Sequence, residues 1–455
     1  MASQWSLRKE VNDLLRFFIE THGCSMNKSD SQIMEELLKS SGFERVGDPS
    51  QADVIILNTC NVKTPTEQKM IHRARELSKY APLVVAGCMA KSQTEVLRRF
   101  SKVFVSPRSI DRIVEAVSAA LEGREAYHLD FRFLDKSSYL RDPLGLIGIV
   151  PIAEGCMGAC TYCITRLARG RLTSFPKSGI MRLVEHFLMR GAVEIWLTAE
   201  DTAAYGRDKG DNLASLLMDL SSIPGEFRVR VGMMTPSSAL PIAGDLIESL
   251  RSAKIYKFLH LPVQSGSDEV LKAMGRNYTV EQFLSIVNLA RKELKEVTIS
   301  TDVIVGFPTE DEEDFERTLR LIERVEPDVV NVSRFGPRPN TPASRMGKLP
   351  DGVVSRRSKI LSELVNRVKE RVNERYLGRE LEVLVSEVGR KGVQGRTNSY
   401  KPVALEDAKP GYFYLVEIVD FRQNYLIGEV KKELGRAGIL HEVELSEIIG
   451  NPIRS

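Results

Sequence analysis

Short apolar runs alternate with segments whose apolar positions repeat every three to four residues throughout the first hundred residues. Such runs are typical of buried strands, and the periodic segments are typical of helices. The runs cover residues 17–19, 54–57 and 83–86, and the helical patterns after them cover 31–40, 66–80 and 91–99. This alternation predicts a small parallel sheet with helices on its faces.

The alternation resumes with a longer period from residue 147 onward. Helical patterns at 180–190, 279–293 and 312–325 separate apolar runs. The six candidate strands cover residues 147–153, 193–198, 227–233, 257–263, 298–304 and 329–334. Six such units predict an incomplete parallel (β/α)6 barrel, whose carboxyl rim should carry the functional site as it does in complete barrels.

The pattern changes once more after a helical segment at 351–375. Five short β-like runs follow, and they predict a small β-barrel. These runs cover residues 381–385, 393–397, 402–405, 411–421 and 425–430. We therefore expect an α/β protein with an N-terminal domain at 14–130, a central domain at 145–350, a helical linker at 351–375 and a C-terminal barrel at 376–435.

Composition narrows the functional classes. The 455 residues include 64 basic and 61 acidic side chains, so the net charge of +3 gives no general affinity for nucleic acid, and RNA binding would need a local patch. No run of 18 apolar residues occurs, and the charged N-terminus does not resemble a signal peptide. Six cysteines in this length argue against a secreted disulfide framework. We expect a soluble cytoplasmic protein with no membrane association.

Three cysteines have the spacing C-x3-C-x2-C directly after the first strand of the central domain: Cys156, Cys160 and Cys163. Their thiolates can bind three irons of a 4Fe–4S cube and leave the fourth iron open for a small molecule. The alternative is a structural zinc site, which needs a fourth Cys or His close by. His186 and His260 are distant in the sequence, so the iron–sulfur interpretation is favoured.

The other three cysteines, Cys24, Cys60 and Cys88, each follow one of the N-terminal apolar runs. Parallel strands point the same way, so these cysteines should meet at the carboxyl edge of one sheet, where open α/β sheets bind ligands. Free cysteines are commonly small buried core residues. Three at equivalent strand ends nevertheless favour a second three-thiolate iron site.

The segments around the N-terminal cysteines resemble three signatures of the methylthiotransferase family, and the Cys156 loop resembles that of the radical S-adenosylmethionine (AdoMet) superfamily. The N-terminal segments are residues 21–30, 58–63 and 86–89. The resemblance implies two 4Fe–4S clusters, each with one open iron. All six cysteines match the ligands of the family, and the Cys156 cluster would bind AdoMet.

Polar residues at the strand ends of the central domain are candidates for AdoMet contacts, by similarity to radical AdoMet enzymes. Glu200 would bind the amino group, and Gln264 and Ser265 the ribose or carboxylate. Asp302 lies on the fifth strand, and Gly306 at its exit would let the backbone approach the adenine. Helix caps and turns explain Ser265 and neighbouring hydroxyl residues equally well.

Residues 389–401 are basic, contain no acidic residue and include an aromatic side chain. Basic and aromatic groups on a β-surface suit RNA, and residues 395–397 resemble the TRAM domain, a small RNA-binding barrel. The alternative is an ordinary basic loop. The predicted RNA contacts are Arg390, Lys391, Arg396, Tyr400 and Lys401.

Residues 168–174 and 194–208 resemble the archaeal and eukaryotic branch of the family, which acts on N6-threonylcarbamoyladenosine at position 37 of tRNA. Eukaryotic members end in a hydrophobic anchor, and this chain ends at Ser455 without one, so the archaeal form is expected. The resemblance implies three partners: a tRNA whose anticodon stem-loop inserts the adenosine, an electron-donor protein and a sulfur source.

The family chemistry addresses an unactivated C–H bond at C2 of adenine. The resemblance implies that AdoMet bound at the Cys156 cluster is cleaved to a 5′-deoxyadenosyl radical, which breaks this bond. The other cluster would present sulfur, and a second AdoMet would supply the methyl group. Both clusters must then face one cavity.

Three alternatives remain open at this stage. Isopentenyladenosine in tRNA is a second possible substrate of the same chemistry. A ribosomal-protein aspartate is the target of another branch of the family. The third alternative is a non-enzymatic iron–sulfur protein that binds RNA.

Overall fold

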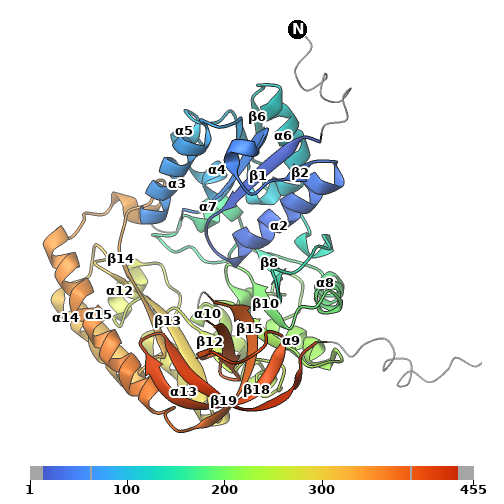
Figure 1. Cartoon of the computed structure of the whole chain (residues 1–455). Coiled ribbons are helices and arrows are strands. Elements are labelled where there is room, and N and C mark those ends of the chain that lie inside the picture. The colour runs from blue at the N-terminus through green and yellow to red at the C-terminus, as the bar shows by residue number, and fades with distance from the viewer. Residues whose placement is uncertain (1–13, 62–63, 390–391, 439–455) are drawn as a thin grey trace, which may run out of the picture.

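The computed structural model describes residues 14–61, 64–389 and 392–438. The N-terminal part is a parallel sheet in the order β2-β1-β3-β4-β5-β6 (Figure 1). Its strands are β1 (Arg16–Thr21), β2 (Glu44–Arg45), β3 (Val54–Thr59), β4 (Leu83–Gly87), β5 (Val103–Val105) and β6 (Ala126–His128). Its helices are α2 (Ser25–Ser40), α3 (Thr64–Leu77), α4 (Cys88–Ser92), α5 (Thr94–Leu97) and α6 (Ile113–Leu121).

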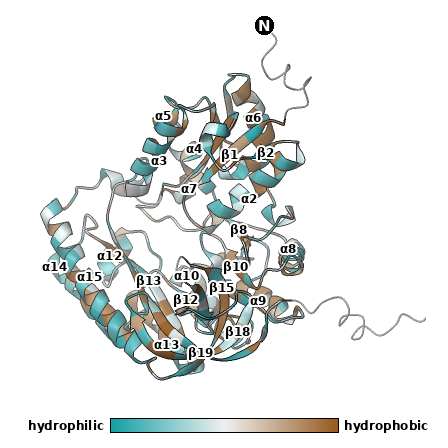
Figure 2. Cartoon of the chain, viewed as in Figure 1, coloured by the Kyte–Doolittle hydropathy of each residue, from teal (hydrophilic) through white to brown (hydrophobic). Residues whose placement is uncertain are grey.

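The central strand β3 shows why the strands of this sheet are continuous apolar runs in the sequence. Val54 and Ile56 pack into the core shared with α2 and α6, whereas Ile55 and Leu57 pack into the core shared with α3. Successive side chains of a strand point to opposite faces, so a sheet with helices on both faces needs apolar residues at every position. Figure 2 shows the hydrophobic strands between these helices.

The central part contains two three-stranded parallel sheets, β11-β10-β7 and β12-β13-β14. A single parallel bridge, Val229 to Ile255, joins them next to β12. The strands are β7 (Ile147–Pro151), β10 (Glu194–Thr198), β11 (Arg228–Val231), β12 (Phe258–His260), β13 (Thr298–Val305) and β14 (Val329–Arg334). Within the described residues β7 and β14 do not pair with each other, so the barrel is open, as predicted.

Helices cover the outside of this open barrel and a small hairpin leads out of β7. The hairpin consists of β8 (Ala153–Glu154) and β9 (Thr173–Ser174). The helices are α7 (Thr165–Arg169), α8 (Lys177–Met189), α9 (Leu213–Ser222), α10 (Pro236–Ala239), α11 (Ala243–Ser249), α12 (Asp268–Ala273), α13 (Val280–Glu293) and α14 (Glu312–Val325). The 24-residue helix α15 (Asp351–Glu374) follows β14 and packs Leu361, Val365 and Val368 into the core of the open barrel.

The C-terminal part is a closed barrel in the order β15-β16-β17-β19-β18. Its strands are β15 (Glu380–Val388), β16 (Val393–Thr397), β17 (Pro402–Leu405), β18 (Tyr412–Arg422) and β19 (Tyr425–Arg436). Val383, Val403 and Val416 fill its interior. In the described part of the chain, no helix combines the length and apolar character needed to cross a bilayer.

Candidate active site at two cysteine triads

The structure brings Cys24, Cys60 and Cys88 to one edge of the N-terminal sheet. Cys24 immediately precedes α2, Cys60 follows β3, and Cys88 begins α4 directly after β4. Because β1, β3 and β4 are adjacent and parallel, their carboxyl ends meet, as the sequence predicts. We call these three residues the N-terminal triad.

Asn27, on the first turn of α2, lies at the centre of the N-terminal triad. Its Oδ1 is 3.9 Å from the Sγ of Cys24 and 4.0 Å from the Sγ of Cys88. Its Nδ2 donates to the carbonyl oxygens of His22 and Thr59 at 2.8 and 2.9 Å. Sequence reasoning missed Asn27; the only signal was its place inside the segment 21–30.

Gly23 makes the close approach within this triad possible. It has a φ of +116°, and an added Cβ would lie 2.7 Å from the Cβ of Cys60 and 3.1 Å from its Sγ. A larger residue would therefore be strained by its backbone and would displace a cysteine. The glycine lets the Cys24 loop pass directly over Cys60.

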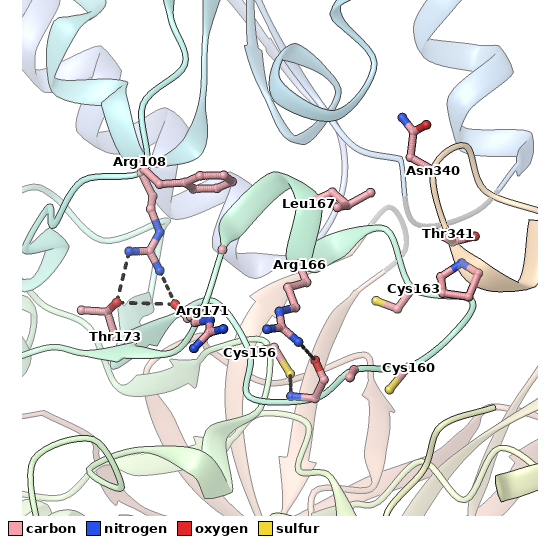
Figure 3. A pocket seen from close by; sticks show the side chains of 15 residues that line it. Arg108, Cys156, Cys160, Cys163, Arg166, Leu167, Arg171, Thr173, Asn340 and Thr341 are labelled. Atoms are coloured by element: carbon pink, nitrogen blue, oxygen red, sulfur yellow. Dashed lines mark hydrogen bonds between the residues drawn. The ribbon is translucent and has the colours of Figure 1, made fainter. Parts of the chain in front are cut away.

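The second triad, Cys156, Cys160 and Cys163, lies in the loop between β8 and α7 and lines a cavity of about 650 Å³ (Figure 3). The backbone N–H of Gly158 donates to the Sγ of Cys156, and Nη1 of Arg276 donates to the Sγ of Cys160, both at 3.2 Å. Burial raises the pKa of Cys156 to about 12. N–H groups aimed at buried sulfur suit thiolates whose protons are replaced by iron.

Both triads have the donor set of an iron–sulfur cube with one open corner. No group of three His, Cys, Asp or Glu side chains in the described residues is placed to hold a single metal ion. A 4Fe–4S cube does not require three side chains around one metal ion, because each of its three ligated irons binds a different thiolate. The residues present therefore fit the clusters that the sequence predicts.

Arg338 lies near one cysteine of each triad. Burial lowers the pKa of its guanidinium, whereas Glu67, Cys60 and Cys163 act in the opposite direction. Glu67 also forms an ion pair with Arg338 at 2.8 Å. Of the six cysteines, only those of the second triad line the 650 Å³ cavity, so the expectation that both triads face one cavity is not confirmed.

Arg169, at the end of α7, forms a buried junction between the two parts of the molecule, and sequence reasoning did not single it out. Its Nη2 donates to Oδ1 of Asn27 at 2.8 Å and to Oδ2 of Asp30 at 2.9 Å. Its Nη1 donates to Oε1 of Glu154 at 2.8 Å, and its Nε lies 3.2 Å from Oε1 of Glu200. The Arg169 side chain is only 1% exposed.

Lys136, in the segment between β6 and β7, completes this buried network. Its Nζ donates to Asp30 at 2.6 Å and to Glu154 at 3.0 Å. Buried charges of this kind are tolerated only when each one is paired. Burial also raises the pKa of Cys88 to about 12, and the positive charge of Arg169 acts against that rise.

The predicted AdoMet residues occupy different environments, and none of them lines the 650 Å³ cavity. Glu200 lies beyond β10 next to the Cys156 loop, where its Oε2 accepts the N–H of Gly155 at 2.7 Å. Burial raises the pKa of Glu200 to about 7. Gln264 has a φ of +70° and is buried, as is Ser265, whose Oγ accepts the backbone N–H of Ser267 at 3.2 Å.

Gly306 and Asp302 both contact other segments of the chain, and their contacts with AdoMet stay predictions. An added Cβ on Gly306 would meet Val354 of α15 at 2.6 Å, and its N–H donates to Glu310 at 3.0 Å. The close approach that this glycine permits is therefore to a helix of the same chain. The carboxylate of Asp302 accepts from Asn331 at 2.7 Å and lies 3.0 Å from Nε2 of His260.

The structure describes three of the five predicted RNA contacts, Arg396, Tyr400 and Lys401, and each has a partner inside the molecule. Arg390 and Lys391 lie outside the described residues. Tyr400 packs its ring 4.8 Å from Tyr256 and 4.9 Å from Phe258 in the central part.

Lys401 and Arg396 are likewise engaged inside the molecule. Lys401 is 4% exposed and forms an ion pair with Asp328 at 2.8 Å. Arg396 donates to Glu387 at 2.6 Å and is mostly buried. Lys401 and Tyr400 thus fasten the barrel to the central part instead of forming an exposed RNA surface.

Full-length relatives give the family. A probable threonylcarbamoyladenosine tRNA methylthiotransferase of Pyrococcus abyssi is 44% identical over 92% of this chain and 100% of its own length. The protein of the same name from Methanocaldococcus jannaschii is 39% identical over 94% of this chain and 99% of its own. This chain belongs to the threonylcarbamoyladenosine tRNA methylthiotransferase family.

The family assignment extends to eukaryotes and to each part of the fold. The threonylcarbamoyladenosine tRNA methylthiotransferase of Drosophila melanogaster is 36% identical over 91% of this chain and 77% of its own. Residues 16–106 match the uncharacterized protein family UPF0004, residues 150–322 the radical SAM superfamily and residues 374–431 the TRAM domain. These matches confirm the three-part architecture.

A solved structure shares the fold at low sequence identity. The radical S-adenosylmethionine methyltransferase TsrM from Kitasatospora setae superposes with a TM-score of 0.56 at 15% identity, over 72% of this chain and 76% of the other. The likeness shows a shared fold over about three quarters of each chain.

Proposed function

We propose that this protein converts N6-threonylcarbamoyladenosine at position 37 of tRNA to its 2-methylthio derivative. The observation that carries the proposal is the presence of two cysteine triads, joined through the buried junction at Arg169, in a chain whose full-length relatives have this name. The substrate carbon has no leaving group, so the reaction needs a radical step. Bound AdoMet and an open-iron cluster supply that chemistry in the radical SAM superfamily.

The residues of this chain have distinct tasks in the proposal. Cys156, Cys160 and Cys163 hold the cluster that binds AdoMet, with Glu200 placed beside their loop to receive the AdoMet amino group. Cys24, Cys60 and Cys88 hold a second cluster, which supplies sulfur. Gly158 and Arg276 direct N–H groups at the thiolates of the first triad and thereby stabilise their negative charge. An electron donor and a sulfur source would complete the system.

Iron analysis tests the two-cluster part of the proposal. Anaerobically reconstituted protein should bind about eight iron atoms, two cubes of four. The triple variant Cys24→Ala/Cys60→Ala/Cys88→Ala should bind about half as much, and Cys156→Ala/Cys160→Ala/Cys163→Ala should lose the other half. Unchanged iron in the first variant would refute the second cluster.

Nucleoside analysis tests the substrate. Reconstituted enzyme, AdoMet, sulfide and a reductant should add one methylthio unit to threonylcarbamoylated tRNA. A matched tRNA that carries isopentenyladenosine should remain unmodified. The reverse preference, or modification of neither tRNA, would refute the assignment.

A further inference from the structure

The cavity beside the Cys156 triad has an unusual charge. Arg108, Arg166 and Arg171 line it, and no Asp or Glu is among the lining residues in the described part of the chain. Asn340 and Thr341 form the wall near Cys163, as Figure 3 shows. A cavity of about 650 Å³ with three guanidinium groups and no carboxylate is suited to an anionic group.

Arg108 is fully engaged in holding the wall of the cavity together. Its Nε donates to the carbonyl oxygen of Arg169 at 2.6 Å, and its Nη2 donates to those of Arg171 and Glu154 at 2.5 and 3.2 Å. Its Nη1 donates to Thr173 at 3.1 Å. Arg108 therefore fixes the loop that carries Arg171 and has little capacity left for a ligand.

Arg166 and Arg171 differ from Arg108 in having most of their donors available. Within the described residues neither forms an ion pair, and the single hydrogen bond from Arg166 goes from Nη1 to the carbonyl oxygen of Gly158 at 3.2 Å. Both residues line the cavity, and in Figure 3 both side chains lie beside Cys156. A guanidinium has five N–H donors, so each can bind a carboxylate.

We propose that Arg166 and Arg171 bind the carboxylate of the threonylcarbamoyl group and thereby select this nucleoside over neutral ones. The inference rests on the proposed function, because that function supplies a substrate with a carboxylate attached to the adenine. The two cationic groups lie next to the Cys156 triad. A carboxylate held there would place the attached base beside the site of AdoMet cleavage.

Other anions could occupy the same cationic groups, namely the RNA phosphates and the AdoMet carboxylate. Binding to three anticodon stem-loops distinguishes the threonylcarbamoyl carboxylate from the RNA phosphates. They carry N6-threonylcarbamoyladenosine, its neutral carboxamide analogue or plain adenosine at position 37, and are otherwise identical. AdoMet binding without RNA distinguishes the second source.

The test uses the reconstituted enzyme and the variants Arg166→Gln, Arg171→Gln and the double variant. The double variant should bind the threonylcarbamoyl stem-loop about ten- to a hundredfold more weakly, the loss expected for charge-assisted hydrogen bonds. Its affinity for the carboxamide and adenosine stem-loops should be unchanged. Arg166→Lys should bind the threonylcarbamoyl stem-loop more tightly than Arg166→Gln does, because lysine keeps the positive charge. The control is Arg182→Gln, which changes an exposed arginine on α8.

Three results would overturn the inference. Equal losses for all three stem-loops would assign the arginines to phosphates, and weaker AdoMet binding would assign them to the cofactor. Unchanged affinity for the threonylcarbamoyl stem-loop would assign them no role in binding. Failure of the proposed function is separate, because it would appear as the absence of methylthiolation by the unsubstituted enzyme. Iron content of each variant confirms that the Cys156 loop is intact.

Discussion

The guanidinium of Arg169 donates a hydrogen bond to the carboxylate of Asp30 across the boundary between the N-terminal and central parts, at 2.9 Å. The same guanidinium contacts Asn27, which lies between two cysteines of the N-terminal triad. Arg169 thus connects the position of one triad to the loop that carries the other. The relative placement of the two triads therefore depends on a buried network in which Arg169 and Lys136 are the cations.

Arg169→Met should destabilise the protein strongly, because it leaves buried carboxylates without their partner. Removal of one member of a buried charge network costs about 3–5 kcal/mol in the free energy of unfolding. Arg320→Gln, which removes an exposed ion pair with Glu316 at 3.4 Å, should cost about 0–1 kcal/mol. Denaturant unfolding of the metal-free proteins measures both values, and equal costs would contradict the proposed importance of the junction.

Gly23→Ala should damage the N-terminal triad more than a matched glycine substitution does. Gly42 also has a positive φ, +86°, but an added Cβ there meets no atom within 4 Å. Gly42→Ala should therefore cost only the backbone strain, about 1–2 kcal/mol. Gly23→Ala adds steric overlap with Cys60, worth about 1–3 kcal/mol more, and should lower iron binding towards half. Full iron content in Gly23→Ala would show that the triad tolerates the displacement.

Lys401→Met should loosen the attachment of the barrel, because Asp328 then lies buried without its cation. The expected loss is about 3–5 kcal/mol in the free energy of unfolding. The double variant Lys401→Met/Asp328→Asn should recover part of it, because the unpaired charge is gone. Under conditions in which both proteins are folded, the salt dependence of tRNA binding by the double variant should equal that of the unsubstituted protein. A shallower dependence would return Lys401 to the RNA surface.

Lys257 should make the free energy of unfolding depend on pH in the alkaline range. Burial, chiefly, lowers its pKa from 10.5 to about 8, with Arg228 acting in the same direction and Glu382 in the opposite one. Between pH 8 and 10.5 the unfolded chain then holds more protons than the folded one, so the free energy of unfolding rises with pH through this window. Relative to Lys257→Met, the melting temperature of the unsubstituted protein should therefore increase from pH 7.5 to pH 10. A constant difference between the two proteins would contradict the shift.

The strands of the central part could be predicted from the sequence because they are buried runs with a regular helix after each. β2, β5 and β6 were missed because they are only two or three residues long. Such short strands are defined by pairing with a neighbour and not by a pattern of their own. The small C-terminal barrel was predicted from five short β-like runs separated by turns with glycine and proline, and the structure shows that it is closed.

The cysteines could be predicted because their evidence is local: a short spacing for one triad and equivalent strand ends for the other. Contacts that depend on distant segments could not be predicted. Val354 of α15 fills the space beside Gly306, and Tyr256 and Phe258 cover Tyr400. The only signal for Arg169 was its place inside the segment 168–174, since nothing in the sequence shows that Asp30 lies opposite.

The anchoring of the barrel through Tyr400 and Lys401 has a consequence for how an RNA would be presented. A barrel that swung freely could deliver several successive nucleotides to the same cavity. Here the contacts of Tyr400 and Lys401 hold the barrel against the central part, so the barrel has a defined position relative to the arginine-lined cavity. An RNA bound by the barrel would then meet the cavity at a set distance along its strand, which favours one nucleotide over its neighbours.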